Sequence, residues 1–309
     1  MSAPTTTWAQ RRREKIDDTA GRSLGADALR RLRRSPTAIT GAVIVGLFVL
    51  VSLCAPLIAP HDPGQAFPEL LDELRPGSIP GPQDGFPFGS DQNGRDEFSR
   101  MILASRQTLL VGVLATLFGL AAGVVVGAVA GAVGGWVDTV LMRVTDVLLS
   151  IPSLLLAISI AALAARPSQT TVIIAVALVN VPIFARLLRG SMLAQRESDH
   201  VLAATALGVR RRAVVLRHML PNAIGPVIVQ ATLTLATAIL DAAALSFLGL
   251  GDADPARAEW GLMLASAQPY LDVRPALAFY PAIAIIIVAL GFTLLGESLR
   301  EALDPKGRR

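Results

Sequence analysis

The stretch of sequence that decides how this chain is organised reads DHVLAATALGVRRRAVVLRHMLPN and covers residues 199–222. It is polar and rich in arginine, whereas the chain around it consists mostly of long apolar runs. Residues 201–207 favour a helix because Ala and Leu are good helix formers, and Gly208 is placed to end that helix in a left-handed cap. Arg210 opens a second short helix, which we expect Pro221 to stop. The pattern predicts two short helices with a glycine break, a form that another protein can hold on one side of a membrane.

The composition around this segment is that of a membrane protein. Of the 309 residues, 52% are hydrophobic and 17% are charged, and the mean hydropathy is +0.54. Soluble domains average about 25% charged residues. We therefore expect an all-α membrane protein with six transmembrane helices, the fourth of them short and interrupted by Asn180 and Pro182. Since a spanning helix needs about 17–25 apolar residues, the expected spans cover residues 39–59, 108–133, 141–164, 170–188, 223–250 and 276–297.

The basic residues set the orientation of these spans. Nine Lys and Arg residues precede the first span, and seven more lie from Arg186 to Arg217. Because cationic loops stay in the cytoplasm, we expect both termini and the 189–222 loop on the cytoplasmic side. The expected units are a basic N-terminal segment 1–38, a first span 39–59, an external Pro- and Gly-rich segment 60–107, a five-helix core 108–305 and a tail 306–309.

Two external segments carry weaker signals. Residues 88–96 are a dense turn signal that fails the pattern of a calcium loop, and residues 97–107 predict a short amphipathic helix that leads into the second span. Trp260 and Tyr270 suit anchors at a membrane interface, and a short re-entrant element fits the 251–275 segment equally well.

Several kinds of catalytic and metal site are missing from the sequence. Three histidines lie outside the expected spans, and Cys54 is the one cysteine, so no His/Cys metal cluster is expected. The two lysines, Lys15 and Lys306, follow no G-x-x-x-x-G loop, which excludes a P-loop. Any ATP must therefore be hydrolysed by another chain. The basic balance (pI about 9.9) follows the topology and not a single face, so we expect no nucleic-acid partner.

Five glycines lie four residues apart along the second expected span: Gly119, Gly123, Gly127, Gly131 and Gly135. Small residues at this spacing form one smooth stripe that lets helix backbones approach closely in lipid. We expect a packing face, with the alternative that this face slides when a pore rearranges.

Charged residues within the expected spans are few, and the main ones are Arg143, Asp146 and Asp241. An intramembrane acid is by default a functional hypothesis. The alternative is that Asp241 only faces an aqueous vestibule near the outer end of its span. A carrier driven by ions would show paired ionisable residues near the midplane.

The arginine-rich segment resembles the ATPase-docking loop, the "EAA" motif, of permease subunits of bacterial ABC importers. Two alanines, then Gly208, nine residues and the run HMLP (218–221) match the family spacing, while Leu202 replaces the acid that names the motif. The resemblance implies a cytoplasmic docking loop over residues 196–222, which is called the docking loop below. The docking residues that it implies are Leu202, Ala203, Ala204, Gly208, Arg212, His218, Leu220 and Pro221.

Other stretches are similar to the dipeptide, oligopeptide and nickel branch of these permeases. They are FGSDQNGRD (88–96), RVTD (143–146), SIP (150–152), LSFLGLG (245–251), WG (260–261) and the run from LG to ALDP (295–305). Related sequences carry an acid where Ala242 stands, and here Asp241 precedes it. The candidate residues of a translocation path are Asp146, Asp241 and Ser246.

This resemblance implies an ABC importer permease fold in the bacterial cytoplasmic membrane. A second homologous permease would complete the pore, two cytosolic ATPases would dock on the two loops, and an external substrate-binding lipoprotein would deliver di- or oligopeptides. ATP and magnesium would be bound in those partner subunits, and this chain would bind no cofactor and catalyse no reaction. The alternatives are import of nickel or another small solute by the same architecture, or a stand-alone secondary transporter.

Overall fold

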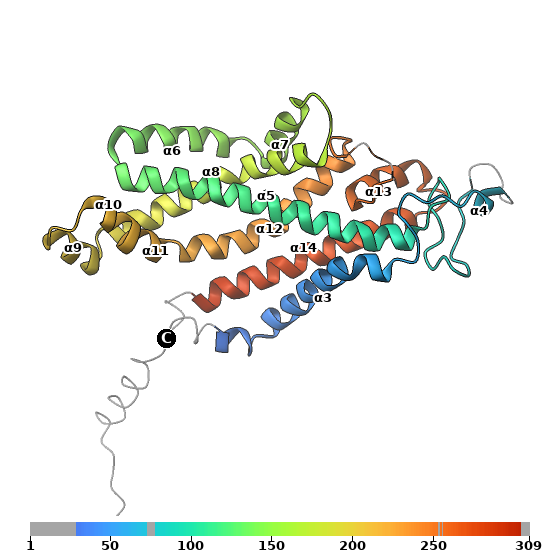
Figure 1. Cartoon of the computed structure of the whole chain (residues 1–309), viewed down its shortest axis with the longest axis horizontal. Helices are drawn as coiled ribbons and strands as arrows, with labels where there is room; N and C mark the ends of the chain where they lie inside the picture. Colours follow the sequence, from blue (N-terminus) through green and yellow to red (C-terminus); the bar gives the residue numbers. More distant parts are fainter. Residues whose placement is uncertain (1–28, 73–77, 253, 255, 304–309) are drawn as a thin grey trace, which may run out of the picture.

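All regular structure in the described part of the chain is helical (Figure 1). A computed structural model describes residues 29–72, 78–252, 254 and 256–303. Most of the expected N-terminal segment and the whole expected tail lie outside these residues. The helices are α3 (Pro36–Ile58), α4 (Glu69–Asp72), α5 (Glu97–Val133), α6 (Gly135–Ser150), α7 (Ser153–Ala162), α8 (Gln169–Arg196), α9 (Asp199–Ala206), α10 (Arg211–Ala213), the π-helix η1 (Val214–Met219), α11 (Leu220–Ala223), α12 (Gly225–Phe247), α13 (Trp260–Ala267), the 3-10 helix η2 (Gln268–Tyr270) and α14 (Ala276–Leu303).

Five helices in these residues are long and apolar enough to cross a membrane: α3, α5, α8, α12 and α14. The bent pair of α6 and α7 makes a sixth when it is counted as one span, the number that the sequence predicted. The axis turns by 97° between α6 and α7, next to Pro152. A residue before proline is driven out of the helical region, and Ile151 is extended at φ −89° and ψ 131°. The third span, expected as one run over 141–164, is therefore broken, and it begins at Gly135.

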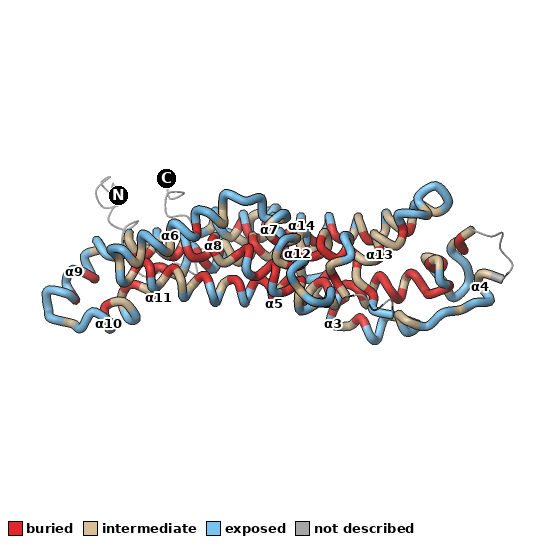
Figure 2. The backbone as a smooth tube through the Cα atoms, turned by 90° about the horizontal axis from the view of Figure 1, so that it is seen from above, coloured by how far each residue is buried: buried red, intermediate tan, exposed pale blue. Residues whose placement is uncertain are grey.

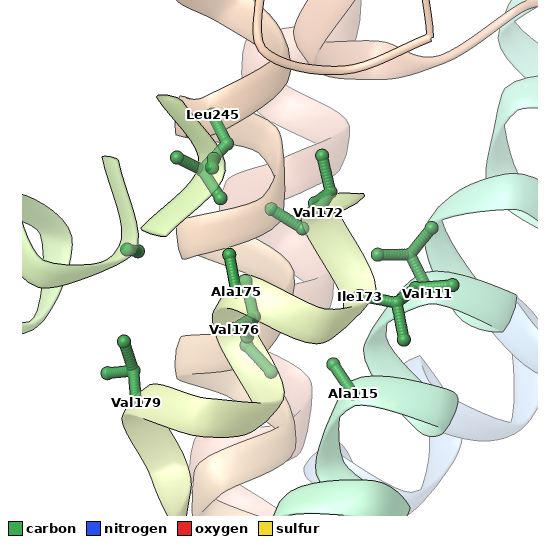
Figure 3. Close-up of a cluster of buried hydrophobic side chains, with 12 residues drawn as sticks. Val111, Ala115, Val172, Ile173, Ala175, Val176, Val179 and Leu245 are labelled. Atoms are coloured by element: carbon green, nitrogen blue, oxygen red, sulfur yellow. The ribbon is translucent and has the colours of Figure 1, made fainter. Parts of the chain in front are cut away.

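The long helices lie side by side along the long axis of the molecule (Figure 1). Helix α8 packs against α5 and α12, while α6 and α7 lie on one side of the bundle and α14 and α3 on the other. A buried apolar cluster joins α8 to α5, α7 and α12, with Val111, Val176 and Leu245 among its members (Figure 3). Figure 2 shows buried positions along the middle of the bundle, while α9 and α10 at one end are mostly exposed.

We call the end of the molecule that carries α9, α10 and α11 the inner end, and the opposite end the outer end. The start of α3 and the end of α14 also lie at the inner end (Figure 1). There, Thr37 Oγ1 and Ser298 Oγ are 3.1 Å apart. This arrangement agrees with the prediction that the first span begins, and the last span ends, on the same side of the membrane as the docking loop.

Two helices are longer than the sequence predicted. The expected short helix at 97–107 is continuous with the second span, because no helix breaker separates them, and α5 is one helix of 37 residues. Its outer end is capped by Asp96, whose carboxylate accepts bonds from the backbone N–H groups of Phe98 and Ser99. The expected interruption at Asn180 and Pro182 is wrong, since α8 runs through both to Arg196. Neighbouring helices support a proline inside a membrane helix, and both residues are buried here.

The glycine stripe of α5 faces α8. A Cβ atom built on Gly123 would lie 2.5 Å from Phe184 Cβ, and one on Gly127 would lie 2.5 Å from Ala185 O. Gly119 and Gly131 approach α8 similarly closely. The fifth glycine of the expected stripe does not belong to it. Gly135 begins α6 with φ +59°, because α5 already ends at Val133.

The outer helix α13 packs into the bundle. Trp260 is only 4% exposed, and its Nε1–H donates to Met101 O at 3.0 Å. The expected role of Trp260 as an interface anchor is therefore wrong, since its ring is a core contact between α13 and α5. A Cβ atom on Gly261 would lie 2.3 Å from Ala243 O, so α13 also touches the α12 backbone.

Candidate docking surface and translocation path

The first helix of the docking loop ends as the sequence predicted. Gly208 has φ +73°. Its N–H donates to Thr205 O at 3.0 Å, and the N–H of Val209 donates to Ala204 O at 3.1 Å. These two bonds form the Schellman motif that ends a helix at a left-handed residue. A Cβ atom on Gly208 would meet nothing within 4 Å, so the backbone conformation, not crowding within the chain, requires glycine here.

Pro221 does not stop the second helix of the loop, contrary to the prediction. It lies in the first turn of α11, where a proline forfeits only an N–H that lacks a helical partner. The preceding turns widen into the π-helix η1, in which Leu220 N–H donates to Val215 O. This wide turn accommodates the proline ring, which would otherwise clash with a carbonyl one turn earlier. The helical path therefore continues through Ala223 and turns into α12 at Ile224.

The two alanines of the motif point in different directions. Ala204 is 7% exposed and packs with Val201, Met192 and Met219 in a buried cluster. Ala203 is exposed. We expected both alanines to face a partner, and this is wrong for Ala204. Residues three apart share one face of a helix, so Ala204 follows Val201 toward the bundle.

The docking loop also carries three exposed leucines. Leu202, Leu207 and Leu216 are 55%, 84% and 62% exposed. Leu202 lines an open groove of about 430 Å³, and Leu216 and Arg212 line a neighbouring one of about 500 Å³. Exposed apolar patches of this kind mark interaction sites.

Two other docking residues, His218 and Leu220, lie on the bundle side of the loop, whereas Pro221 is exposed. His218 and Leu220 are half-buried, and Leu220 packs against the same cluster as Ala204. The backbone carbonyl of His218 accepts a bond from Asn222 Nδ2 at 2.7 Å. The docking residues therefore divide into an exposed set that a partner can touch and an inner set that holds the loop on α8.

Helix α12 carries a row of polar side chains that the described helices cover only in part. Gln230 and Asp241 are half-buried and Thr237 is exposed. Their spacing of seven and four residues puts them on one stripe of the helix. By contrast, Ser246 is 1% exposed, and its hydroxyl donates to Glu259 Oε1 at 2.5 Å. The structure thus places Asp241 on the open stripe and Ser246 in a contact between α12 and the start of α13.

Asp146 lies at a second open region, toward the inner end. It forms an ion pair with Arg186 of α8, and both side chains are about half exposed. Arg186 and Gln230 line one groove of about 610 Å³ between α6, α8 and α12. The structure therefore brings Asp146 close to the inner end of the α12 stripe. Asp241 is eleven residues beyond Gln230, or about 16 Å along the helix.

Two polar features of the site were missed in the sequence. A second ion pair joins α6 to α8, where Arg189 donates to both carboxylate oxygens of Asp138 at 2.9 and 2.6 Å. The aspartates and arginines of these pairs are far apart in the sequence, and only the fold of α6 back onto α8 pairs them. The second feature is a group of buried charges at the outer end, which we call the outer charge cluster. It consists of Asp91, Arg95, Asp96, Glu97 and Arg100.

Bonds within this outer charge cluster are dense. The Asp91 carboxylate accepts from the backbone N–H groups of Asn93 and Arg95 at 2.8 and 2.9 Å, and from Arg95 Nε at 2.7 Å. Arg100 Nη1 donates to Pro63 O at 2.6 Å. The SDQNGRD run at residues 90–96, which the sequence marked only as a turn signal, is therefore a buried polar network that holds the external segment on α5.

Known families match most of this chain. The model of the binding-protein-dependent transport system inner membrane component matches residues 123–309, and that of the N-terminal TM domain of oligopeptide transport permease C matches residues 23–76. The dipeptide transport system permease protein of Alkalihalophilus pseudofirmus is 40% identical over 280 residues, which cover 91% of this chain and 89% of that protein. The glutathione transport system permease protein of Escherichia coli O6:K15:H31 is 42% identical over 277 residues, covering 90% and 89%.

Two solved structures share the fold. An inward-facing MetNI methionine ABC transporter has a TM-score of 0.54 at 16% identity, covering 66% of this chain and 96% of that chain. An amino acid ABC transporter solved with histidines has a TM-score of 0.52 at 17% identity, covering 65% and 92%. At this identity the likeness shows the fold alone.

Proposed function

The chain belongs to the family of binding-protein-dependent transport system inner membrane components and is a permease subunit of an ABC importer, and on that premise we propose that it imports di- or oligopeptides. The chief support is the dipeptide permease that is 40% identical across 91% of this chain. The glutathione permease at 42% identity agrees, since glutathione is itself a small peptide. Membership of this family contradicts the alternative of a stand-alone secondary transporter.

The chain is a multi-pass protein of the bacterial inner membrane, and members of its family work with ATPases, a partner permease and a substrate-binding protein. In this proposal it forms half of a pore whose other half is a second homologous permease. Two cytosolic ATPases bind ATP and magnesium and dock on the two loops, and an external lipoprotein delivers the peptide. This chain itself binds neither ATP nor magnesium.

The exposed part of the docking loop is proposed as the contact for one ATPase. Leu202 stands where the family has an acid, and it extends an apolar surface that includes Leu207 and Leu216. An acid would have offered a charge to the partner, whereas Leu202 offers apolar area. The contact with the ATPase is therefore expected to depend more on apolar burial than on ion pairs. Arg212 and Ala203 border this surface.

The polar stripe of α12 is proposed to line the translocation path. A charged side chain that faces lipid costs several kcal/mol (roughly 3 or more at the bilayer centre), so Asp241 is more stable beside water. Asp241 would meet the peptide toward the outer end, and the Arg186–Asp146 pair would meet it near the inner end. The second permease closes this path from the opposite side.

The experiment that tests the function is transport by the purified complex. The two permeases, the ATPases and the binding protein are reconstituted in liposomes, and ATP-dependent uptake of labelled di- and tripeptides is measured. We expect saturable peptide uptake that requires ATP and the binding protein. Uptake of nickel without uptake of peptides would contradict the proposed substrate while leaving the importer intact.

The translocation path is tested in the same liposomes. Asp241→Asn is expected to lower peptide uptake several-fold because the stripe loses its charge. Ser246→Ala serves as the matched control on the same helix, since that side chain is buried away from the stripe. Equal effects of the two changes would contradict the assignment of the path.

A further inference from the structure

The docking loop touches the rest of the molecule in two different ways. Its apolar side chains, including Val201, Ala204 and Met219, pack with Phe184 and Met192 of α8. Its hydrogen bonds to α5 come from the side chain of Arg211. The loop therefore packs mainly against α8, with Ala132 of α5 at the edge of the same cluster, and its hydrogen bonds to α5 come from a guanidinium.

The tie is made at the inner end of α5. Arg211 Nη2 donates to Ala132 O at 2.6 Å and to Val133 O at 3.0 Å. These are the last two residues of α5. The last four carbonyls of an α-helix have no partner within the helix, and a cation there also interacts favourably with the helix dipole. Arg211 thus bonds carbonyls that α5 cannot satisfy by itself.

Open grooves flank this contact on two sides. Arg211 and Ala132 together line two open grooves, one of about 430 Å³ and one of about 500 Å³. The guanidinium therefore bridges hollow space between the loop and the helix. These two hydrogen bonds are the polar contacts through which a displacement of the loop can act on α5.

Helix α5 is suited to carry such a displacement across the membrane. Its 37 residues span about 55 Å. Its glycine stripe gives it a smooth face against α8. Its outer end, capped by Asp96, belongs to the outer charge cluster. A movement at Arg211 would therefore reach the external segment without bending a flexible connection.

We propose that Arg211 is a positioning residue for transport, which ties the docking loop to the inner end of α5 so that movement of the loop moves this helix. The role rests on the proposed function, because it requires ATPases that move the loop. Arg211 touches no substrate in this proposal. It converts a displacement of α9 and α10 into a displacement of α5, while the apolar contacts of the loop move α8.

The chemistry of arginine suits this role. A planar guanidinium has several donors in a fixed geometry, whereas a lysine ammonium is a single flexible point charge. Lysine at this position keeps the favourable charge at the helix end and can bond one carbonyl. We therefore expect Arg211→Lys to retain part of the coupling, and Arg211→Ala to lose it.

The test measures how many peptides are transported for each ATP hydrolysed by the complete reconstituted importer. Arg211→Ala is expected to lower this ratio about tenfold, within the range of known couplings between sites, while the ATPases still co-elute with the permeases and hydrolyse ATP. Arg211→Lys is expected to stay within about threefold of the wild-type ratio. Arg300→Ala removes an exposed positive charge from the inner end of α14, outside the docking loop, and serves as the matched control, with an unchanged ratio.

A tethered variant distinguishes loss of the Arg211 contact from loss of folding. Ala132→Cys and Arg211→Cys are combined in a chain whose single cysteine, Cys54, is replaced by Ala. A short thiol-reactive linker then replaces the hydrogen bonds with a covalent tie. Recovery of the ratio after linking supports the role of Arg211. A linked complex that hydrolyses ATP but does not recover the ratio contradicts it.

Failure of this inference differs from failure of the proposed function. If the wild-type complex takes up no peptide, the proposed substrate is overturned, and the ratio is then measured with the solute that it does transport. If the wild-type complex takes up peptide and Arg211→Ala leaves the ratio unchanged, the role of Arg211 is overturned.

Discussion

The two ends of this molecule are built on opposite principles. At the outer end, Asp91 and Arg95 are about 5% exposed and bonded to each other and to the backbone. At the inner end, Leu202, Leu207 and Leu216 are more than half exposed. A buried charge is stable only beside its partners, and here those partners belong to the same chain. Exposed apolar side chains, in contrast, are stabilised when a partner covers them. The outer end is thus held together by contacts within this chain, whereas the inner end leaves apolar surface exposed.

The largest effect is expected from breaking the outer charge cluster. Asp91→Ala removes a carboxylate that faces the buried Arg95 and Arg100. Removing one partner of a buried ion pair costs about 3–5 kcal/mol, because the remaining charge stays desolvated. The midpoint of thermal unfolding in detergent should fall by many degrees.

The matched control for this change is Asp252→Ala. Asp252 pairs with Arg257, whose side chain is 53% exposed, so the loss should be about 0–1 kcal/mol. Equal losses for Asp91→Ala and Asp252→Ala would show that the outer end is no more self-sufficient than an ordinary surface.

The next effect concerns the helix that joins the two ends. Gly123→Ala would bring a Cβ atom within 2.5 Å of Phe184 Cβ, so α5 and α8 must separate. Overpacking of this kind costs about 1–3 kcal/mol. Gly46→Ala in α3 has nothing within 4 Å and should be neutral or stabilising. Unfolding of both variants is compared with the wild type, and a neutral Gly123→Ala would mean that the smooth face is not needed.

A smaller effect is expected at the inner end, from Gly208. With φ at +73°, alanine costs about 1–2 kcal/mol of backbone strain, although no neighbour obstructs its Cβ. Asparagine tolerates this conformation better. ATP-dependent uptake should therefore fall more for Gly208→Ala than for Gly208→Asn. A larger loss with asparagine would instead indicate that a partner approaches Gly208 closely.

The smallest effect is a dependence of stability on pH at the outer end. Burial raises the pKa of Glu259 above its usual 4.5, although the bond from Ser246 opposes the shift. Because the folded state holds this proton more tightly than the unfolded state, the protein loses stability as the pH rises from 4.5 through the raised pKa. Glu259→Gln should flatten the unfolding midpoint over that range. Parallel pH curves for the variant and the wild type would contradict this assignment.

Much of the fold follows from local sequence signals. The five single-helix spans, the shared side of the first and last spans and the left-handed Gly208 were predicted because hydropathy, loop charge and glycine placement act within a few residues. The wrong predictions also came from local signals, which contacts with the surrounding structure outweighed. Pro182 is held inside α8 by its neighbours, and Pro221 is accommodated by a wide turn. Trp260 was read as an interface residue, and packing against α5 buried it.

The candidate site was only partly predictable for a related reason. The motif spacing located the docking loop, but it could not show that Ala204 turns inward while Ala203 stays exposed. It also could not show that Ser246 is bonded to Glu259 and removed from the open stripe of α12. Side-chain direction depends on which neighbour covers each face, and the spacing along a single helix does not specify that neighbour.

The sequence by itself determined that the chain spans a membrane and holds no P-loop, and it predicted that an ATPase docks on residues 196–222. Each of these depends on composition or on residues close together in the chain. Only the tertiary structure decided the long-range polar contacts: Asp146 with Arg186, Asp138 with Arg189, and Arg211 with the end of α5. Those partners are 40 to 79 residues apart. Charged groups so far apart in the sequence can pair only when apolar packing has fixed the positions of the helices that carry them.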